Sequence, residues 1–508
     1  MQKRTKYGIL TAVLVGVFVS GMDQNVVGTA MPRIIADLGG MDLYSWVFTA
    51  YMLASTIFIP IFGKLSDIFG RKYFYMTGIG IFIIFSFFSG LSPTMYWLIF
   101  SRASQGVGAA MMTALGPVII GDIFTPKERG RYQGIFGAVF AVSSIIGPLI
   151  GGFLTDNVNW HWVFYVNIPI GIVAIILTYT FIPKNLGSNV LNVKVDYLGS
   201  FFIGISIFLF LLGTSYASID NSWMERKVIV LFIASAITIF IFYFVERRAQ
   251  EPIFELKLFR NKIFSLSSVI NFITGFTLFA LLVYIPLFFQ AAQGQSAMNS
   301  GLILMPAMVT GGVASILGGF YISKTGKYKL AFILSALISS YGLYRMISLT
   351  STSPVLEINI DMMIAGFGAG VSMGMMFVVI QGTVEKRYSG IALSSITFFR
   401  NIGGTIGTAV LGTVVSNYYT SQLQRIPKIV NFILPKDLLS FMNNPQFLMN
   451  KSDILSKVSP AFKTILNGIF ADMSEYLANA IDRAFFLSMI MAIIALILAI
   501  LLPRQKIL

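Results

Sequence analysis

The first candidate functional residue of this chain is an aspartate inside an apolar run. Asp23 lies in the stretch "GVFVSGMDQNVVGTAMPRI" at residues 16–34, where most neighbours are apolar. A buried carboxylate is costly without a partner, and inside a lipid bilayer ionisable residues usually belong to ion pathways or substrate sites. The chemistry available to such an acid is to bind a cation, or to take up and release a proton.

The predicted partner of Asp23 is Arg102. Each residue lies about eight positions from the outer end of its own apolar run, hence roughly 12 Å deep at the rise of a helix. An acid and a guanidinium at matched depth neutralise each other. Because burial disfavours a charged carboxyl and a nearby cation favours it, movement of Arg102 would switch Asp23 between holding and releasing a proton. The alternative is a static pair that only fixes helix packing.

The elements that must position these residues are membrane helices. Of 508 residues, 56% are hydrophobic and 11% are charged, and the mean hydropathy is +0.80, which indicates a membrane protein. Apolar runs of about 18 to 25 residues predict spanning helices. The fourteen runs lie near 8–30, 44–62, 73–92, 95–121, 132–154, 162–182, 197–217, 228–245, 263–290, 299–321, 330–349, 358–382, 390–416 and 481–502. The first is too long for a signal peptide and contains Asp23, so we expect it to be retained.

The net charge of +15 is explained by topology. If the N-terminus is cytoplasmic, most Lys and Arg residues fall on inner segments, and the short outer loops hold only Arg33, Arg226 and Lys227. This distribution follows the positive-inside rule. The basic balance therefore predicts membrane lipids as partners and no nucleic acid. We expect a multi-pass monomer in the cell membrane with cytoplasmic N- and C-termini.

Several kinds of chemistry are excluded by residue usage. The chain has no cysteine and one histidine, His161, which lies between two tryptophans and is expected to anchor at the membrane interface. No G-x-x-x-x-G-K-[ST] motif occurs, so ATP is not the expected energy source. We expect no cofactor, no metal and no enzymatic activity. The rival of another class, an intramembrane enzyme that uses Asp23, lacks a second deep acid.

The chain repeats itself at an interval of 256 residues. "RYQGIFG" at 131–137 recurs as "RYSGIAL" at 387–393, and "GKLSDIFGRK" at 63–72 aligns with "GFYISKTGKY" at 319–328. The interval predicts two six-span halves, at 1–183 and 263–508, separated by two inserted spans at 184–262. Six-span repeats around a midplane cavity are the build of secondary transporters. A long outer loop at about 418–480 contains an apolar helical pattern at 461–477, which predicts an amphipathic helix on the outer surface.

The segment after the second predicted span is a candidate inner gate. Its glycines allow a tight turn, and its acid lies beside two cations, so ion pairs can form and break as the halves rock. Simple anchoring would need the cations and not the acid, which favours a gate. In the second copy Ser323 replaces the acid. The candidate gate residues are Gly63, Asp67, Gly70, Arg71 and Lys72.

Small residues also mark the fifth predicted span. In "GPLIGG", Gly147 and Gly151 are four positions apart on one helix face, with Gly152 beside them. This spacing lets another helix approach closely. Pro148 removes a backbone hydrogen bond and predicts a kink.

Arg400, in "FFRNIGG", lies about ten residues from the inner end of its run and so near mid-membrane. No second-half acid shares its depth, because Glu385 is predicted at the inner end and Asp361 near the outer end. These three residues are candidates for substrate binding or coupling. With one deep acid and two deep cations, an anionic or zwitterionic substrate stays open.

The motifs together resemble the major facilitator superfamily. "GKLSDIFGRK", "RASQGVGAA" and "GAVFAVSSIIGPLIGG" resemble its three signature motifs, of which the last is the antiporter motif. "MDQNVVGTAMP" and "WHWVFYVNIPIG" are similar to motifs of its fourteen-span drug:proton antiporter branch. The resemblance implies an all-α integral membrane protein with fourteen transmembrane helices, as two six-helix bundles plus two inserted helices. It also implies that Asp67 braces the inner ends of the halves in the outward-facing state.

The resemblance further implies a proton-coupled multidrug exporter of amphiphilic, aromatic or monocationic compounds. We expect Asp23 to match a monovalent cation, with Arg102 and Arg400 adding positive potential to the same cavity, so that rigid dications are exported poorly. The alternative keeps the fold but exports a lipid, siderophore or other endogenous anionic or zwitterionic solute. The predicted outer amphipathic helix would suit a lipid.

Overall fold

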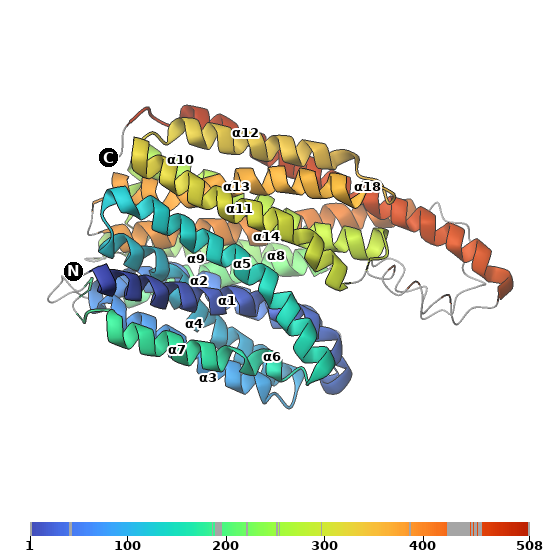
Figure 1. Cartoon of the computed structure of the whole chain (residues 1–508), viewed down its shortest axis with the longest axis horizontal. Coiled ribbons are helices and arrows are strands. Elements are labelled where there is room, and N and C mark those ends of the chain that lie inside the picture. Colours follow the sequence, from blue (N-terminus) through green and yellow to red (C-terminus); the bar gives the residue numbers. More distant parts are fainter. Residues whose placement is uncertain are drawn as a thin grey trace.

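A computed structural model describes residues 3–39, 43–184, 186–187, 196–219, 222–249, 252, 255–295, 297–385, 388–423, 448, 451, 455 and 460–505. Within these ranges the secondary structure is helical, with no strand (Figure 1). The helices run roughly side by side, and the N- and C-termini lie at the same end of the molecule. We call this the terminal end.

The helices fall into three groups along the chain. The first group comprises α1 (Lys3–Leu38), α2 (Tyr44–Phe69), α3 (Arg71–Gly90), α4 (Met95–Ile123), α5 (Pro126–Asn157), α6 (Trp162–Tyr165) and α7 (Asn167–Phe181). The second is α8 (Tyr197–Ile219) and α9 (Arg226–Arg248). The third comprises η2 (Leu256–Arg260), α10 (Lys262–Leu287), η3 (Phe288–Ala292), α11 (Ala297–Thr325), α12 (Lys329–Arg345), η4 (Met346–Ser348), α13 (Val355–Thr383), α14 (Ser389–Leu423) and α18 (Pro460–Leu501).

Local sequence signals account for several helix starts. The Thr94 side chain accepts a hydrogen bond from the Trp97 amide at 3.3 Å and caps α4. Thr125 and Glu128 form a capping box at the start of α5. Prolines lie inside several of the long helices, which continue past them because packed neighbours tolerate such interruptions in membrane proteins. Examples are Pro60, Pro117, Pro148, Pro286 and Pro306.

Thirteen helices in the described part of the chain are long and apolar enough to cross a membrane. The protein is therefore a multi-pass membrane protein, as predicted. The predicted run at 390–416 lies inside α14, a 35-residue helix that is not among the thirteen.

The sequence repeat has a counterpart in the backbone. Gly70, between α2 and α3, has φ +92°, and Gly326, between α11 and α12, has φ +65°. The two positions are 256 residues apart and correspond in the repeat. Both require the left-handed backbone that glycine adopts without a steric penalty. The tight turn predicted in "GKLSDIFGRK" is thus made by Gly70, whereas Gly63 lies within α2.

The two outer groups of helices meet along paired helices. α5 packs lengthwise against α11, and α2 packs against α14. In Figure 1, α5 and α11 lie side by side in the middle of the molecule. The inserted helix α8 packs on α9 and also contacts both α2 and α14.

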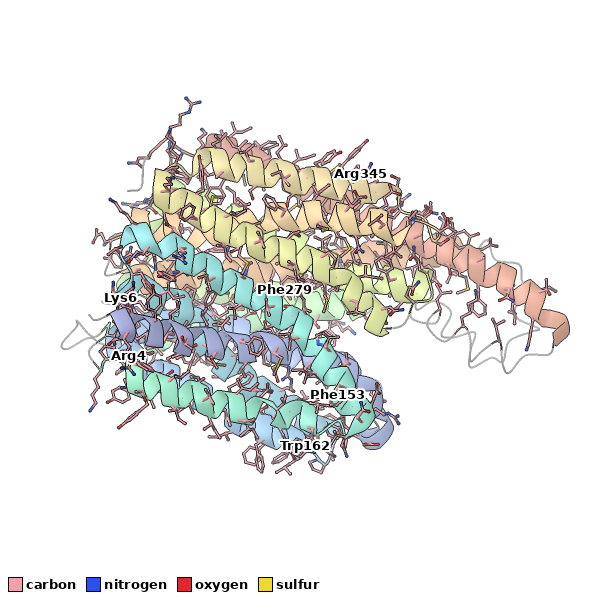
Figure 2. The ribbon with its side chains drawn as sticks, in the orientation of Figure 1. Arg4, Lys6, Phe153, Trp162, Phe279 and Arg345 are labelled. Atoms are coloured by element: carbon pink, nitrogen blue, oxygen red, sulfur yellow. The ribbon has the colours of Figure 1, made fainter. Side chains whose placement is uncertain are left out.

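The two ends of the molecule differ in their charged and aromatic side chains. Arg4 and Lys6 lie at the terminal end, whereas the exposed rings of Phe153 and Trp162 lie toward the opposite end (Figure 2). The turn at Gly70, which carries adjacent basic residues, connects α2 to α3 at the terminal end. Positive charge therefore gathers at the terminal end in this region.

The predicted outer helix at 461–477 is helical, but it does not lie on the surface as a separate element. It is the first part of α18, which runs without a break from Pro460 to Leu501 and extends beyond the other helices (Figure 1). "YLANAIDR" at 476–483 contains no glycine or proline to end the helix. Its apolar face is covered by protein, since Phe470 and Met473 are buried in a cluster with Tyr419 and Leu448. Of the long outer loop predicted at about 418–480, most of the part at 424–459 falls outside the described residues.

We expect Phe470→Ala to destabilise the protein by about 3 kcal/mol, because it removes a core side chain that is only 1% exposed. The matched control is Ile465→Ala, which should have little effect because Ile465 on the same helix is 41% exposed. The measurement is the midpoint of thermal denaturation in detergent. Equal midpoints for the two variants would show that this part of α18 does not pack on the protein.

Candidate functional site

Asp23 on α1 and Arg102 on α4 form an ion pair inside the N-terminal group of helices. Arg102 Nη1 lies 2.5 Å from Asp23 Oδ2. Asp23 is 0% exposed and Arg102 is 1% exposed. The structure thus brings together the two residues that were paired from their depths alone. Their mutual neutralisation is the condition for placing both charges away from water.

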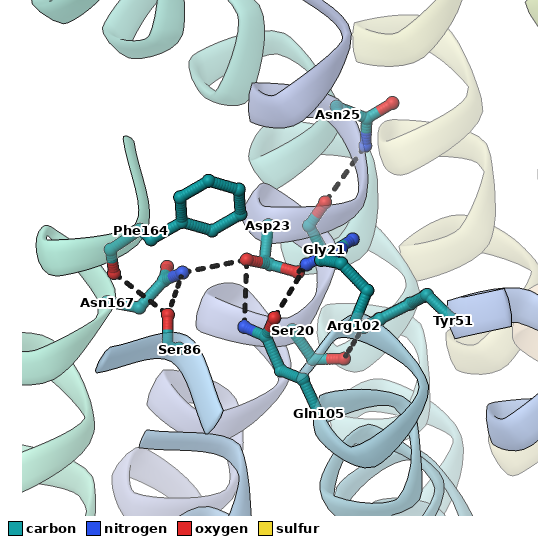
Figure 3. Close-up of polar contacts among 10 residues, drawn as sticks. All are labelled: Ser20, Gly21, Asp23, Asn25, Tyr51, Ser86, Arg102, Gln105, Phe164 and Asn167. Atoms are coloured by element: carbon teal, nitrogen blue, oxygen red, sulfur yellow. Dashed lines mark hydrogen bonds and ion pairs between the residues drawn. The ribbon is translucent and has the colours of Figure 1, made fainter. Parts of the chain in front are cut away.

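Amide side chains complete the coordination of Asp23 (Figure 3). Asn167 and Gln105 each donate to Asp23 Oδ1, at 2.7 Å and 3.0 Å. Arg102 Nη1 also donates to Gln105 Oε1 at 2.7 Å. Both oxygens of Asp23 therefore have donors, and the acid is tied to two other elements of the fold, α4 and α7.

Two aromatic rings and a serine enclose the pair. The Arg102 guanidinium carbon lies 4.3 Å from the ring centroid of Tyr51 and 5.9 Å from that of Phe164. Ser86 accepts from Asn167 at 3.0 Å and donates to the Phe164 carbonyl at 2.8 Å. Helices α1, α2, α3 and α4 and the α6–α7 segment all contribute to this cluster.

Sequence reasoning missed five of these residues, of which Phe164 lies in the same stretch as Asn167. Gln105 lies one helical turn after Arg102, and Asn167 stands in "WHWVFYVNIPIG", so both had a readable signal. Tyr51 and Ser86 had none, because they come from helices whose facing sides only the packing sets.

The glycines of α5 form the contact with α1 beside Asp23. A Cβ atom added to Gly147 would lie 2.8 Å from the backbone oxygen of Met22, and one added to Gly151 would lie 2.6 Å from that of Val26. Nothing lies within 4 Å of the corresponding position on Gly152. Gly147 and Gly151 therefore allow the two helices to touch, as predicted from their spacing, whereas Gly152 takes no part.

A cavity lies between the N-terminal and C-terminal groups of helices. It is lined by residues of α5, α10, α11, α13 and α14, including Phe140, Met373 and Arg400. Neither Asp23 nor Arg102 lines it. The expectation that both arginines share one cavity with Asp23 is therefore wrong, because α5 stands between the ion pair and the cavity.

Arg400 is 8% exposed and faces this cavity. Its guanidinium carbon lies 5.8 Å from the ring centroid of Phe140. Within the described part of the chain, Arg400 makes no hydrogen bond and no ion pair, which sets it apart from Arg102.

Asn25 connects the two regions. Its Nδ2 atom donates to the Gly21 carbonyl at 2.9 Å, and it lies 3.4 Å from the hydroxyl of Ser144 on α5. Ser144 lines the cavity. A polar contact thus leads from α1, two residues beyond Asp23, to the cavity wall.

The candidate gate forms an ion-pair cluster at the terminal end. Arg71 pairs with Asp67, and its Nε lies 3.2 Å from Asp122 Oδ2. Arg71 also donates to the Ser66 hydroxyl at 2.6 Å. The carboxylate of Asp67 lies against Gly390 at the start of α14, where a Cβ atom would collide with it.

The other gate residues take different roles. Lys72 donates to the Tyr179 carbonyl at 2.6 Å, so its contact is with α7. Gly63 lies opposite Ser394 of α14, where the missing side chain lets the helices touch. The turn role expected for Gly63 is wrong, because the backbone reverses only at Gly70.

The second copy of the gate makes the reciprocal contact. Ser323, which replaces the acid, accepts a hydrogen bond from the Gly130 amide of α5 at 2.9 Å. Gly319 approaches the Gly130 backbone so closely that neither could carry a side chain there. Each copy therefore contacts the other group of helices.

The remaining candidates lie apart from Arg400. Asp361 Oδ1 lies 3.0 Å from Arg345 Nε, and Arg345 also contacts Glu357 at 3.2 Å. Asp361 is thus held in an ion pair between α12 and α13, and it does not line the cavity. Glu385 follows the end of α13 and is exposed. Both acids were candidates for matching a charge on the substrate, and the positions of Asp361 and Glu385 do not support that role.

Fold and site define a multi-pass helical membrane protein built from a repeated unit around a cavity between its halves. The family model of the Major Facilitator Superfamily matches residues 13–408, and the chain belongs to this superfamily. Multidrug resistance protein 3 of Bacillus subtilis (strain 168) is 36% identical over 422 residues, covering 83% of this chain and 82% of that protein.

Two further comparisons agree. Multidrug transporter protein MdtP of Bacillus subtilis (strain 168) is 33% identical over 515 residues, covering 98% of this chain and 93% of that protein. The structure of the proton:xylose symporter XylE matches with a TM-score of 0.60 at 12% identity, covering 98% of this chain and 95% of that one. At this identity the structural match supports the fold alone.

The α1–α5 contact predicts unequal effects at adjacent glycines. We expect Gly151→Ala to cost about 1–3 kcal/mol of stability, since the added methyl group would overlap the Val26 backbone. Gly152→Ala should be tolerated, because its neighbourhood is empty. Heating followed by fluorescence-detected size exclusion measures the surviving folded protein. Equal losses in both variants would contradict a specific role of Gly151 in this contact.

Proposed function

We propose that this chain is a proton-coupled exporter of amphiphilic, aromatic drugs across the cytoplasmic membrane. The observation that carries the proposal is the fully buried Asp23–Arg102 pair, which is separated by one helix from a cavity between the two halves. A deep ionisable pair beside such a cavity is the expected arrangement for coupling ion movement to solute movement. The two Bacillus relatives, whose names state multidrug resistance and multidrug transport, support the drug class.

We further propose fourteen spans, arranged as a six-helix bundle at 1–183, an inserted pair at 184–262 and a six-helix bundle at 263–508. The N- and C-termini lie at the same end of the molecule, and a chain returns to the side on which it started only after an even number of membrane crossings (Figure 1). Adding α14 to the thirteen apolar helices of the described residues gives that even number. The basic terminal end would face the cytoplasm. The protein would work as a monomer among membrane lipids, exchanging protons for substrate without catalysis or ATP.

Protonation of Asp23 would act on α1 through its bonds. A neutral carboxyl loses most of its attraction for Arg102 and one acceptor position for Asn167 or Gln105. The helix would then shift against α5, whose Gly147 and Gly151 touch the α1 backbone. Because α5 also lines the cavity, the shift would reach the substrate site through Ser144. A proton and a substrate that favour different positions of α5 are thereby coupled.

The contacts at the terminal end support an outward-facing conformation. The Asp67–Gly390, Gly63–Ser394 and Gly130–Ser323 contacts all join the two halves near that end. Opening toward the cytoplasm would require these contacts to separate. Asp67 would therefore brace the closed inner end and release it once per cycle.

The substrate class needs revision in one respect. Charge matching of monovalent cations depended on Asp23 facing the cavity, and α5 separates the two. The alternative, export of an endogenous anionic or zwitterionic solute, is favoured by the one observation that Arg400 faces the cavity.

The decisive experiment measures accumulation of a fluorescent amphiphile in inverted membrane vesicles with and without a proton gradient. Wild-type protein should accumulate the dye only with the gradient. Asp23→Asn should abolish gradient-driven accumulation, because the amide cannot exchange a proton, and should retain downhill dye movement. Arg102→Lys should also fail, since an ammonium cannot replace a guanidinium that bonds Asp23 and Gln105 and stacks on Tyr51. Undiminished accumulation by Asp23→Asn would overturn the coupling role.

A separate prediction concerns the gate. Asp67→Asn should slow transport by about tenfold, because it weakens the charge-assisted bond to Arg71 that holds Asp67 against Gly390 of the other half, and should leave substrate affinity unchanged. The measurement compares transport rate with dye binding by fluorescence polarisation in detergent. Asp156→Asn, an exposed acid at the far end of α5, is the control. A loss of affinity as large as the loss of rate would place Asp67 outside the gate.

A further inference from the structure

The cavity between the halves carries a single fixed charge. Among its described lining residues Arg400 is the only one that is ionisable, and most of the others are aliphatic, methionine or glycine. Leu281, Met308 and Met373 are examples from three different helices. Apolar walls with one charged group describe a site for a molecule that has an apolar body and one charge.

The guanidinium of Arg400 has no hydrogen-bond or ion-pair partner in the described residues. Desolvating a charged group is costly unless an opposite charge or hydrogen-bond acceptors compensate. Its five donors in a planar fork match a carboxylate, phosphate or sulfonate. Phe140 contacts the guanidinium at 5.8 Å and offers an aromatic face, but no acceptor oxygen. The unfilled position beside Arg400 therefore calls for an anionic group.

The hydroxyl groups in the cavity are already engaged. Thr274 donates to the Ile270 carbonyl at 2.9 Å, and Ser144 donates to the Phe140 carbonyl at 3.0 Å. Each bond lies within the residue's own helix, so these hydroxyls bring no net charge to the cavity. Arg400 is left as the group that discriminates between ligands by charge.

The acids that could neutralise Arg400 from within the protein are placed elsewhere. Asp23 is bonded to Arg102 behind α5, and Asp361 is bonded to Arg345 between α12 and α13. Glu385 lies beyond the end of α13. Because no acid pairs with Arg400 within the described residues, we expect its counter-charge to come from the cavity contents.

We propose that Arg400 selects substrates that join one anionic group to an apolar or aromatic body, and that this exporter carries such organic anions in preference to cations. The inference rests on the proposed proton-coupled export. The anionic group binds the guanidinium, and the body lies against Phe140 and the aliphatic walls of α10, α11 and α13.

The sign of the substrate charge has an electrical consequence. When one proton enters for each monovalent anion that leaves, both movements carry positive charge inward, so the exchange is driven by the membrane potential as well as by the pH difference. One proton exchanged for one monovalent cation moves no net charge. Sensitivity of transport to the membrane potential thus reports on the substrate class independently of affinity.

The test uses purified protein in proteoliposomes and three fluorescent probes with the same aromatic body. One carries a carboxylate, one its methyl ester and one a primary amine. We expect wild-type protein to transport the carboxylate best under a proton gradient. Arg400→Gln should reduce carboxylate transport at least about tenfold and leave the neutral ester nearly unchanged, since a charge-assisted bond is lost only for the anion. Arg400→Lys should recover part of the carboxylate transport.

The control for overall charge is Arg226→Gln, which removes an exposed cation at the start of α9 and should leave all three probes unaffected. Retained ester transport by Arg400→Gln shows that the variant is folded. A potassium diffusion potential, imposed with valinomycin at constant pH, provides the second measurement. We expect a potential that is positive inside the liposome to accelerate movement of the carboxylate into the lumen by wild-type protein, in exchange for protons that leave the lumen.

Equal transport of carboxylate and ester by wild-type protein, or an equal loss of all three probes in Arg400→Gln, would overturn the assignment. Transport of the carboxylate that does not respond to the potential would overturn the electrical part. A failure of the proposed function gives a different result: no probe, whatever its charge, would then respond to the proton gradient.

Discussion

A charge held away from water needs a partner, and this constraint organises the interior of the protein. Asp23 and Arg102 satisfy it with each other and with two amide side chains. Asp361 with Arg345, and Asp67 with Arg71, satisfy it as ion pairs at other places. Arg400 lines the cavity, is largely buried, and makes no hydrogen bond or ion pair within the described residues. The charged sites thus differ in how they are neutralised, and the roles proposed for them in coupling, gating and substrate binding fall on different sites.

Close packing connects these separate sites. α5 touches α1 through glycines that replace side chains by backbone contact, and the same helix presents Phe140 and Ser144 to the cavity. Near the terminal end, α5 also meets α11 through Gly130 and Ser323. A rigid helix that contacts three functional regions can transmit a small displacement from one region to another, because packed interfaces switch between discrete arrangements. These regions therefore differ in their chemistry but are connected mechanically through one helix, α5.

The repeat explains why the candidate gate has two unequal copies. Gly70 and Gly326 make the same turn, and the residues before them contact the opposite half in both copies. One copy uses a carboxylate paired with an arginine, whereas the other uses a neutral hydroxyl. The acidic copy depends on charge and the serine copy on a single hydrogen bond, so the two sides of the inner closure differ in how strongly they respond to changes in charge.

The sequence by itself determined the features that depend on position along a single helix. Hydropathy predicted the helices, and the repeat aligned the two turn glycines. The constant rise per residue predicted equal depths for Asp23 and Arg102, which suggested their pairing. Only the tertiary structure decided which way each side chain faces. It placed α5 between the ion pair and the cavity, left Arg400 there without a partner, enclosed Asp23 with Gln105 and Asn167, and fused the outer helix into α18. The depth of a residue in the membrane follows from its position along one helix, so it can be read from the sequence. The direction in which a side chain faces depends on how several helices pack together, which no single stretch of sequence encodes.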